Sequence, residues 1–400
     1  MIADLRKEFN SKFSDSLYQR MLSELEHRAG CEIEFRVAET PLFLSKQMAV
    51  HAATAAENIL SKAASAELQA FGVKAIPSQW NVANETDRPL FAAVDFAVTG
   101  DRHDPKFKLI ELQGFPSLYH YQPVFSEVVR DLYDLPAHSN GLFDPSIGIA
   151  RYYEYLKQAI VGDCDPSEVA LLEIDPHHQK TRPDFYLAAS HLGIRIVDIR
   201  SVVARGNELF APDSEERLHR IKRIYNRAIV DELVRKNVEL QFDITAAHGV
   251  EWAGHPNWYF RISKVLLPKL VGVNDAVPNA VTIDQADIES FDLSSYVLKP
   301  LFSFAGLGVN INPTVEDIAV IPKEERSNWL LQEKVEYCSA FETPDGNSVK
   351  AELRALCLWL PEWDKPKAMH TLVRLTRGKM VGVDYNKGLD WVGSSCALVV

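Results

Sequence analysis

The sequence lacks the long apolar runs that membrane-spanning and secreted proteins contain. No segment of its 400 residues approaches the roughly eighteen consecutive apolar side chains of a transmembrane helix. The N-terminal residues, MIADLRKEFNSKF, are charged and periodic, and they contain no apolar core like that of a signal peptide. We therefore expect a cytoplasmic protein without a membrane partner.

Basic charge and cysteine are also scarce. Lysine and arginine together number 43, against 55 aspartate and glutamate residues, and the formal net charge is −12. Because phosphate contacts need a basic surface, this balance argues against nucleic acid as a partner. The five cysteines form no C-x-x-C pair and are expected to be reduced, mostly buried thiols; they are Cys31, Cys164, Cys338, Cys357 and Cys396. Small molecules are the expected partners, and the oligomeric state is left open.

Apolar periodicity in the first part of the chain predicts helices and strands. Apolar residues recur every four positions from Leu5 to Leu25, which predicts one amphipathic helix that ends near Gly30. The alternating segment EIEFRV, residues 32–37, predicts a strand, and the alanine-rich residues 45–71 predict one long helix. Two further strands are expected at LFAAVDFAV (90–98) and KLIELQGF (108–115).

From residue 165 onward the pattern predicts a parallel α/β unit. The buried strands EVALLEI and IRIVDI flank a helix that ends at Gly193, and ERLHRIKRIYNRAIVDELV runs from a strand into a helix. No glycine fingerprint follows the first strand, so we do not expect a dinucleotide site here. A second α/β half is expected from about residue 255, with strands near 296–300, 329–335, 350–358, 371–376 and 380–386.

The segment YVLKPLFSFAGLGVNI, residues 296–311, places a lysine before a glycine-containing loop. Val297 and Lys299 would share one face of the expected strand, because strand side chains alternate. The loop glycines allow backbone N–H groups to approach an anion, and a lysine beside them suits the phosphates of a nucleotide. Taken alone, such a segment is more often an ordinary strand boundary and turn, and it matches neither the Walker nor the kinase pattern.

Residues 329–337, WLLQEKVEY, form an apolar strand that runs into polar residues. A strand that ends in this way can present the backbone of Gln332, Glu333 and Val335 to the edge of a purine, with an apolar side chain against its face. An amphipathic strand at a sheet edge is the alternative, and the segment alone favours it.

Two pairs of polar residues lie farther along the chain. Glu352 and Arg354 in KAELRALCLW share a strand face, for which an ordinary surface ion pair is the alternative explanation. Asp384 and Asn386 also lie two apart, and their oxygens are hard ligands of the kind that Mg²⁺ selects, although a simple turn is the alternative. If the strands are neighbours, Glu352 would add a carboxylate, and Arg374 would lie close to developing phosphate charge.

The order of these motifs resembles that of the ATP-grasp carboxylate ligases, and it is most similar to the glutathione synthetase and glutathionylspermidine synthase branches. The resemblance covers roughly residues 165–396. It implies an α/β fold, α+β in parts, in which two ATP-grasp lobes grip ATP. The implied regions are an N-terminal helical and strand extension on the substrate side (1–164), a parallel α/β domain (165–254) and the ATP-grasp lobes (255–400).

The resemblance also implies a role for each motif residue. Lys299 would contact the ATP phosphates, and the SFAGLG loop would cover them. Lys264 would be the earlier ATP-binding lysine that precedes a helix, and the end of the strand at 329–335 would form the adenine hinge. The residues thus assigned to ATP are Lys264, Lys299, Ser303, Gly306, Gly308, Gln332, Glu333 and Val335. Those assigned to Mg²⁺ are Glu352, Asp384 and Asn386, and those facing the acyl phosphate are Arg354 and Arg374.

Substrate contacts follow from weaker similarity. Asn226 and Arg227, with the adjacent Tyr225, would border the substrate cleft. Glu111 and Gln113 match a glutathionylspermidine synthase motif in which an asparagine stands where this chain has Gln113. Many relatives carry two glycines after the Mg²⁺ asparagine, whereas NKGLDW has one, at the phosphate- or product-facing end of the site.

The expected function is ATP-dependent carboxylate–amine ligation. A substrate carboxylate would attack the γ-phosphorus of ATP to give an acyl phosphate, and an amine would then displace phosphate to form an amide. Two alternatives remain: a nucleotide- or substrate-binding protein that has kept the fold and lost turnover, and an ATP-dependent small-molecule kinase. The identities of the acid and the amine are not evident from the residues.

Overall fold

The computed structural model describes residues 2–101, 104–301, 308–378, 381 and 386–400. Three of the predicted site residues, Ser303, Gly306 and Asp384, lie outside these ranges. Within them, no helix combines the length and the apolar character that crossing a membrane would need. The five cysteines are all free, as expected, but only Cys357 and Cys396 are fully buried.

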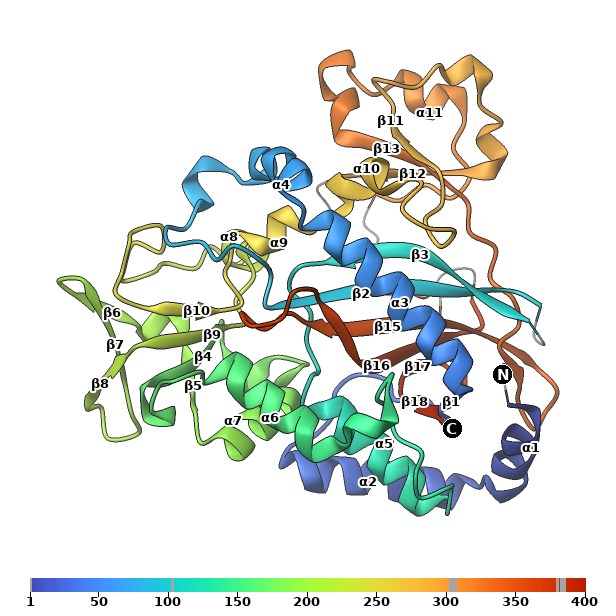
Figure 1. Ribbon diagram of the computed structural model, residues 1–400, viewed down its shortest axis with the longest axis horizontal. Coiled ribbons are helices and arrows are strands. Elements are labelled where there is room, and N and C mark those ends of the chain that lie inside the picture. The colour runs from blue at the N-terminus through green and yellow to red at the C-terminus, as the bar shows by residue number, and fades with distance from the viewer. Residues whose placement is uncertain (1, 102–103, 302–307, 379–380, 382–385) are drawn as a thin grey trace.

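An antiparallel sheet with the strand order β17-β16-β15-β2-β3 forms the centre of the molecule (Figure 1). All but the last residue of β2 are buried, because structure packs on both faces of the sheet. The short strand β14 pairs with β15 outside this path. The strands are β2 (Phe91–Gly100), β3 (Pro105–Gln113), β14 (Phe341–Glu342), β15 (Ser348–Leu358), β16 (Lys367–Thr376) and β17 (Gly393–Ser395).

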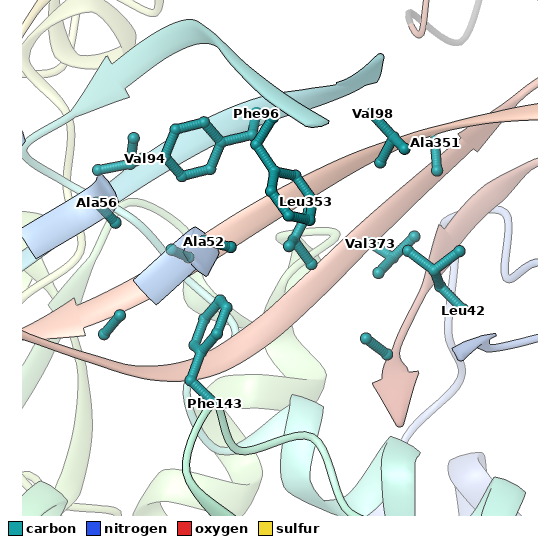
Figure 2. Packing of buried hydrophobic residues seen from close by; sticks show 14 of the residues in the cluster. Leu42, Ala52, Ala56, Val94, Phe96, Val98, Phe143, Ala351, Leu353 and Val373 are labelled. Atoms are coloured by element: carbon teal, nitrogen blue, oxygen red, sulfur yellow. The ribbon is translucent and has the colours of Figure 1, made fainter. Parts of the chain in front are cut away.

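Helix α3, Lys46–Ala63, lies across one face of this sheet (Figure 1). Alanine favours the helix, and its small side chain lets the helix approach the strands closely. Figure 2 shows Ala52 and Ala56 of α3 near Phe96 of β2 and Leu353 of β15, and all four side chains are fully buried. This contact forms the middle of the largest apolar core.

A parallel α/β unit packs against the central sheet at the lower left of Figure 1, as the sequence predicts. Its sheet has the order β10-β9-β4-β5, and every neighbouring pair is parallel. An antiparallel sheet β6-β7-β8 extends from it. The elements are β4 (Val169–Glu173), α7 (Arg182–Leu192), β5 (Arg195–Asp198), β6 (Val203–Arg205), β7 (Glu208–Pro212), β8 (Leu218–Ile221), β9 (Arg223–Asn226), α8 (Val230–Arg235) and β10 (Glu251–Ala253).

A smaller antiparallel sheet, β11-β13-β12, forms a separate lobe at the upper right of Figure 1. Its own core contains Leu298, Ile318 and Leu331. Residues 334–340 leave β13 without regular structure and lead to the central sheet. The lobe consists of β11 (Ala280–Thr282), β12 (Tyr296–Pro300), α11 (Val315–Ala319) and β13 (Trp329–Glu333). The predicted strands at 296–300 and 329–335 are confirmed to within two residues.

The remaining elements surround the central sheet. Strand β1 pairs in parallel with β18, so residues 42–44 lie beside residues 397–399. The elements are α1 (Ala3–Lys12), α2 (Asp15–Ala29), β1 (Leu42–Leu44), α4 (Ala66–Gly72), α5 (Tyr121–Leu132), α6 (Ile149–Ile160), α9 (Trp258–Arg261), α10 (Leu267–Leu270) and β18 (Ala397–Val399).

Three local predictions are wrong. The single helix expected over the first thirty residues is two, because the hydroxyl oxygen of Ser14 caps α2 by accepting a hydrogen bond from the backbone N–H of Leu17. The single helix expected at 45–71 is divided before α4, with Ser65 at the N-cap position. Residues 32–37 form no strand, and only Val37 makes an isolated bridge.

The central sheet also draws its strands from two of the predicted regions. β2 and β3 belong to the region 1–164, whereas β15, β16 and β17 belong to 255–400. Both regions therefore share one sheet, although the predicted domain boundaries themselves stay a prediction.

The contact between α3 and the sheet makes a testable prediction. Replacing the fully buried Leu353 by alanine should lower the free energy of unfolding by about 2–5 kcal/mol, because it removes apolar contacts and leaves a cavity. Urea denaturation measures the change. Val320→Ala is the matched control: its side chain is 79% exposed, and it should shift stability by less than about 0.5 kcal/mol. Equal urea midpoints for Leu353→Ala and Val320→Ala would contradict the assignment of Leu353 to the core between α3 and the sheet.

Candidate active site

A cavity of about 480 Å³ lies between the small lobe and the central sheet. Its walls come from β12, β13, the segment after β13, and β15. The lining includes four of the residues assigned to ATP from the sequence, Lys299, Gln332, Glu333 and Val335, together with Glu352 from the metal set. Val297 lines it as well, so Val297 and Lys299 share a strand face as predicted. We call this space the interlobe cavity.

Lys299 is held in the wall of the interlobe cavity by Gln332. The ammonium group donates a hydrogen bond to Gln332 Oε1 at 2.7 Å, and Gln332 Nε2 donates to the backbone carbonyl of Leu109 at 3.2 Å. Burial lowers the pKa of Lys299 to about 8; Glu111 and Glu352 oppose this change, and Lys264 adds to it. The lysine is thus positioned and poorly hydrated, as an anion ligand should be.

The side chains of the predicted hinge residues Gln332 and Glu333 make different contacts. The side chain of Gln332 is fully buried and already paired, whereas the carboxylate of Glu333 accepts hydrogen bonds from the backbone N–H and the side-chain amide of Asn279, both at 3.1 Å. After Glu333 the chain leaves the sheet, and Lys334 through Tyr337 line the cavity. Backbone groups after Glu333 are therefore the ones that a ligand in the cavity could contact.

A row of charged side chains crosses the central sheet next to this cavity. The strand register places Glu111 of β3 opposite Asp95 of β2, and Asp95 opposite Arg354 of β15. Arg354 binds Asp95 through two hydrogen bonds, Nε to Oδ1 and Nη2 to Oδ2, both 2.7 Å. Arg374 of β16 donates to the same Oδ2 at 2.8 Å. One carboxylate thus holds two guanidinium groups side by side.

Asp95 was missed by the sequence analysis. It is fully buried, and although burial alone would raise its pKa, Arg354 and Arg374 hold that pKa below its ordinary value. The available signal was a lone acidic residue within the apolar run LFAAVDFAV. A charge at such a position needs buried partners, but which strands supply them depends on pairings distant in sequence.

Glu352 is bound on both sides. Its Oε2 lies 2.5 Å from Arg374 Nη2, and its Oε1 accepts a hydrogen bond from the hydroxyl of Tyr337. Both residues do form ion pairs between strands, Glu352 with Arg374 and Arg354 with Asp95. The alternative is wrong only in placing such a pair at the surface, because the carboxylates of both pairs are buried. The arrangement links the interlobe cavity to the row of charges.

A second cavity, of about 290 Å³, lies beyond Arg374. Its lining contains four of the predicted residues, Glu111, Gln113, Lys264 and Arg374, beside aromatic side chains such as Phe115 and Tyr259. Burial lowers the pKa of Lys264, and burial together with Asp95 raises that of Glu111. We call this space the aromatic cavity.

Asn226 and Arg227 line neither cavity. Arg227 donates to the carbonyl of Pro116 at 2.7 Å, and its guanidinium lies 4.7 Å from the ring centroid of Phe115. Asn226 Oδ1 accepts from the backbone N–H of Ala228 at 3.2 Å. Arg227 therefore supports Phe115, which lines the aromatic cavity, and the loop before it, whereas Asn226 holds the turn that follows β9.

The predicted Mg²⁺ ligands are not brought together within the described residues. Asn386 Oδ1 accepts hydrogen bonds from Thr376 Oγ1 at 2.8 Å, Arg377 N at 3.1 Å and Gly378 N at 3.2 Å. This oxygen is therefore bound to donors at the C-terminal end of β16. Glu352 is occupied by Arg374 and Tyr337. Among the described residues, no group of three or more His, Cys, Asp or Glu side chains could hold a metal ion.

Of the predicted phosphate loop, the structure describes Gly308. Its φ of +74° is in the left-handed region, and a Cβ there would approach Pro300 Cγ to 3.0 Å. The positive φ favours glycine at this position, because other residues adopt it only with strain. Ser303 and Gly306 of the same loop, and the metal candidate Asp384, lie outside the described residues.

Comparison with known proteins defines the fold. No protein-family model and no curated protein matches the sequence. A glutathione synthetase-like effector from Globodera pallida, in its apo form, superposes with a TM-score of 0.60 over 98% of this chain and 99% of that chain, at 12% identity. This chain has a glutathione synthetase-like fold. The predicted resemblance is thereby confirmed at the level of the fold.

A second solved structure is less similar. A Methylobacillus flagellatus protein that carries the name gamma-glutamylcysteine synthetase has a TM-score of 0.39 and 12% identity, over 82% of this chain and 84% of that chain. The superposition is too loose to support an argument.

Removal of the central carboxylate tests the row of charges. Asp95→Asn should lower the free energy of unfolding by about 3–5 kcal/mol, because Arg354 loses its buried counter-charge and Arg374 keeps only Glu352. Urea denaturation at neutral pH measures this cost. The control is Glu154→Gln, which breaks the exposed pair with Arg151 and should change stability by less than about 1 kcal/mol. An unchanged midpoint for Asp95→Asn would show that Asp95 does not hold the two arginines together.

Proposed function

We propose that the protein is an ATP-dependent ligase that joins a carboxylate to an amine through an acyl phosphate. The observation that carries the proposal is the convergence of Lys299, Gln332, Glu333 and Val335 on one cavity between two lobes. The order of motifs in the sequence predicts these four residues. They come from two strands and from the segment that links the lobes. The glutathione synthetase-like fold supports the same assignment.

The interlobe cavity is the proposed nucleotide site. Its volume of about 480 Å³ falls within the range of small-molecule sites, roughly 300–1,000 Å³. The backbone N–H of Lys334 is already bonded to the carbonyl of Ser295, so the backbone of residues 335–336 is the part that can face the adenine edge. Val297 and Val335 supply apolar walls. Lys299, on the same strand face as Val297, is the cation for the phosphates.

The aromatic cavity is the proposed substrate site. Arg374 lines it and also pairs with Glu352, which lines the interlobe cavity, so the guanidinium lies between the two spaces. A carboxylate in the aromatic cavity would thus lie next to a positive group on the nucleotide side. Charge that develops during phosphoryl transfer is best stabilised by donors that are already oriented, and Asp95 orients both arginines.

Mg²⁺ accompanies ATP in most phosphoryl transfers, where it neutralises phosphate charge. Both carboxylate oxygens of Glu352 are already paired, one with Arg374 and one with Tyr337, so we assign no step to Mg²⁺. This pairing favours a second candidate function, a nucleotide-binding protein of the same fold without turnover. A substrate screen separates the two, since the binding protein would bind ATP and release no phosphate.

Phosphate release is the primary test. The wild-type chain should release phosphate from ATP when supplied with an acid and an amine from a panel of amino acids, short peptides and polyamines. Lys299→Ala should reduce the rate about a hundredfold or more, because it removes a preorganised cation. Lys157→Ala, which changes an exposed lysine of α6 that lines neither cavity, is the control.

The dependence on the amine distinguishes the remaining outcomes. Release that requires the amine supports the ligase, whereas a stable phosphorylated product formed without it would identify a kinase. Nucleotide binding without any turnover across the panel would support the non-catalytic protein. Full turnover by Lys299→Ala would overturn the site assignment itself.

Nucleotide affinity should depend on pH. The pKa of Lys299 is about 8, below the ordinary value for lysine, so its charged form is lost as the pH rises through about 8. ATP affinity should therefore fall above that pH, by up to about tenfold per unit. Calorimetric titration with ATP at several pH values measures the slope. Lys299→Arg keeps its charge throughout this range, and an equal slope in this variant would contradict the role of Lys299.

A further inference from the structure

A third cavity, of about 230 Å³, lies where α1 meets Phe43 of β1 and the strand β14. Its wall combines the apolar side chains of Ile2, Phe43 and Phe341 with two cationic residues, Arg6 and Lys7, and one acidic residue, Glu342. Neither the motif analysis nor the proposed ligase reaction uses any of these residues. We call this space the N-terminal cavity.

Arg6 is the central group of this cavity. Its guanidinium carbon lies 4.1 Å from the ring centroid of Phe341, 5.0 Å from that of Phe43 and 5.4 Å from that of Phe9. Nη1 donates to the hydroxyl of Thr40, and Nη2 donates to the backbone carbonyl of Pro41 at 2.6 Å. Three aromatic rings and two neutral oxygens therefore surround one positive charge.

No carboxylate among the described residues neutralises Arg6. Burial is what lowers the pKa of Arg6 to about 9, and no acidic side chain offsets it. Three other arginines differ, since Arg182 pairs with Glu34, Arg354 with Asp95, and Arg374 with both Asp95 and Glu352. Arg227 resembles Arg6, because a backbone carbonyl and aromatic rings hold it. A desolvated charge without a counter-ion is costly, so the surroundings of Arg6 favour an incoming anion.

The remaining donors match a carboxylate. A guanidinium has five N–H groups in a planar fork, and two of its nitrogens already hold Thr40 and Pro41. The unused donors belong to a side chain that lines the cavity, and a carboxylate can accept two of them in parallel. Lys7, exposed at the edge of the cavity, adds a second positive charge.

The apolar wall of the N-terminal cavity indicates that the part of the ligand beyond its carboxylate is apolar. A space of about 230 Å³ equals about eight water molecules at roughly 30 Å³ each. An inorganic anion would leave Ile2, Phe43 and Phe341 facing water, whereas an apolar body would cover them. We propose that the N-terminal cavity binds a small monocarboxylate with an apolar body, whose carboxylate pairs with Arg6.

Benzoate is a suitable probe, and benzamide is its neutral isostere. Calorimetric titration of the full chain should detect benzoate binding and should show benzamide binding at least tenfold more weakly, since only benzoate supplies the missing charge. Arg6→Gln should weaken benzoate at least tenfold. Inorganic phosphate should bind more weakly than benzoate, because it cannot cover the apolar wall.

Two further variants keep the test decisive if Arg6→Gln fails to fold. Ala3→Trp, at an exposed helix position that lines the cavity, should fill the space and abolish benzoate binding while Arg6 is retained. Lys299→Ala alters only the interlobe cavity and should leave benzoate affinity unchanged. The proposal is overturned if the wild-type chain does not bind benzoate, if benzamide binds equally well, if Ala3→Trp retains affinity, or if Lys299→Ala loses it.

Discussion

The carboxylate of Asp95 lies fully buried in the middle of the central sheet, where two guanidinium groups share it. Each of the three charges would be costly alone, and the group is tolerable because every member has a partner. Arg354 and Arg374 are fixed by this shared carboxylate, and Arg374 in turn fixes Glu352. The orientation of Arg354, Arg374 and Glu352 therefore depends on Asp95, one residue of β2.

The two cavities of the proposed active site meet at this group of charges. Glu352 belongs to the lining of one cavity and Arg374 to that of the other, and the two side chains form an ion pair. A carboxylate in one space and a nucleotide in the other would thus be separated by a salt bridge, not by an apolar wall. Small movements of the lobe β11-β13-β12 would alter one side of the site and leave the sheet unchanged.

Much of the fold was predictable because its signals are local. Apolar runs located β12, β13, β15 and β16, and their alternation correctly placed Val297 and Lys299 on one face. Residues near one another in sequence, such as Gln332, Glu333 and Val335, were also grouped correctly. The helix breaks at Ser14 and Ser65 had a local signal too, since serine favours the N-cap position.

The remaining features depend on long-range pairing. Asp95 meets Arg354 and Arg374 only because β2 lies beside β15, and no pattern within β2 specifies that neighbour. Asn386 has the composition of a metal ligand, but its oxygen is directed by the end of β16, where three donors converge on it. Composition identifies which atoms are present, whereas register and packing determine where those atoms point.

The pairing of β1 with β18 has a consequence for biosynthesis. Leu42, Phe43 and Leu44 find their strand partners only at Ala397, Leu398 and Val399, and β2 finds one of its two neighbours in β15. During translation the N-terminal strands must therefore emerge from the ribosome long before they can be paired. Until then their apolar side chains and open strand edges are accessible to other chains. A nascent chain of this protein is thus a natural client for chaperones that bind extended apolar segments.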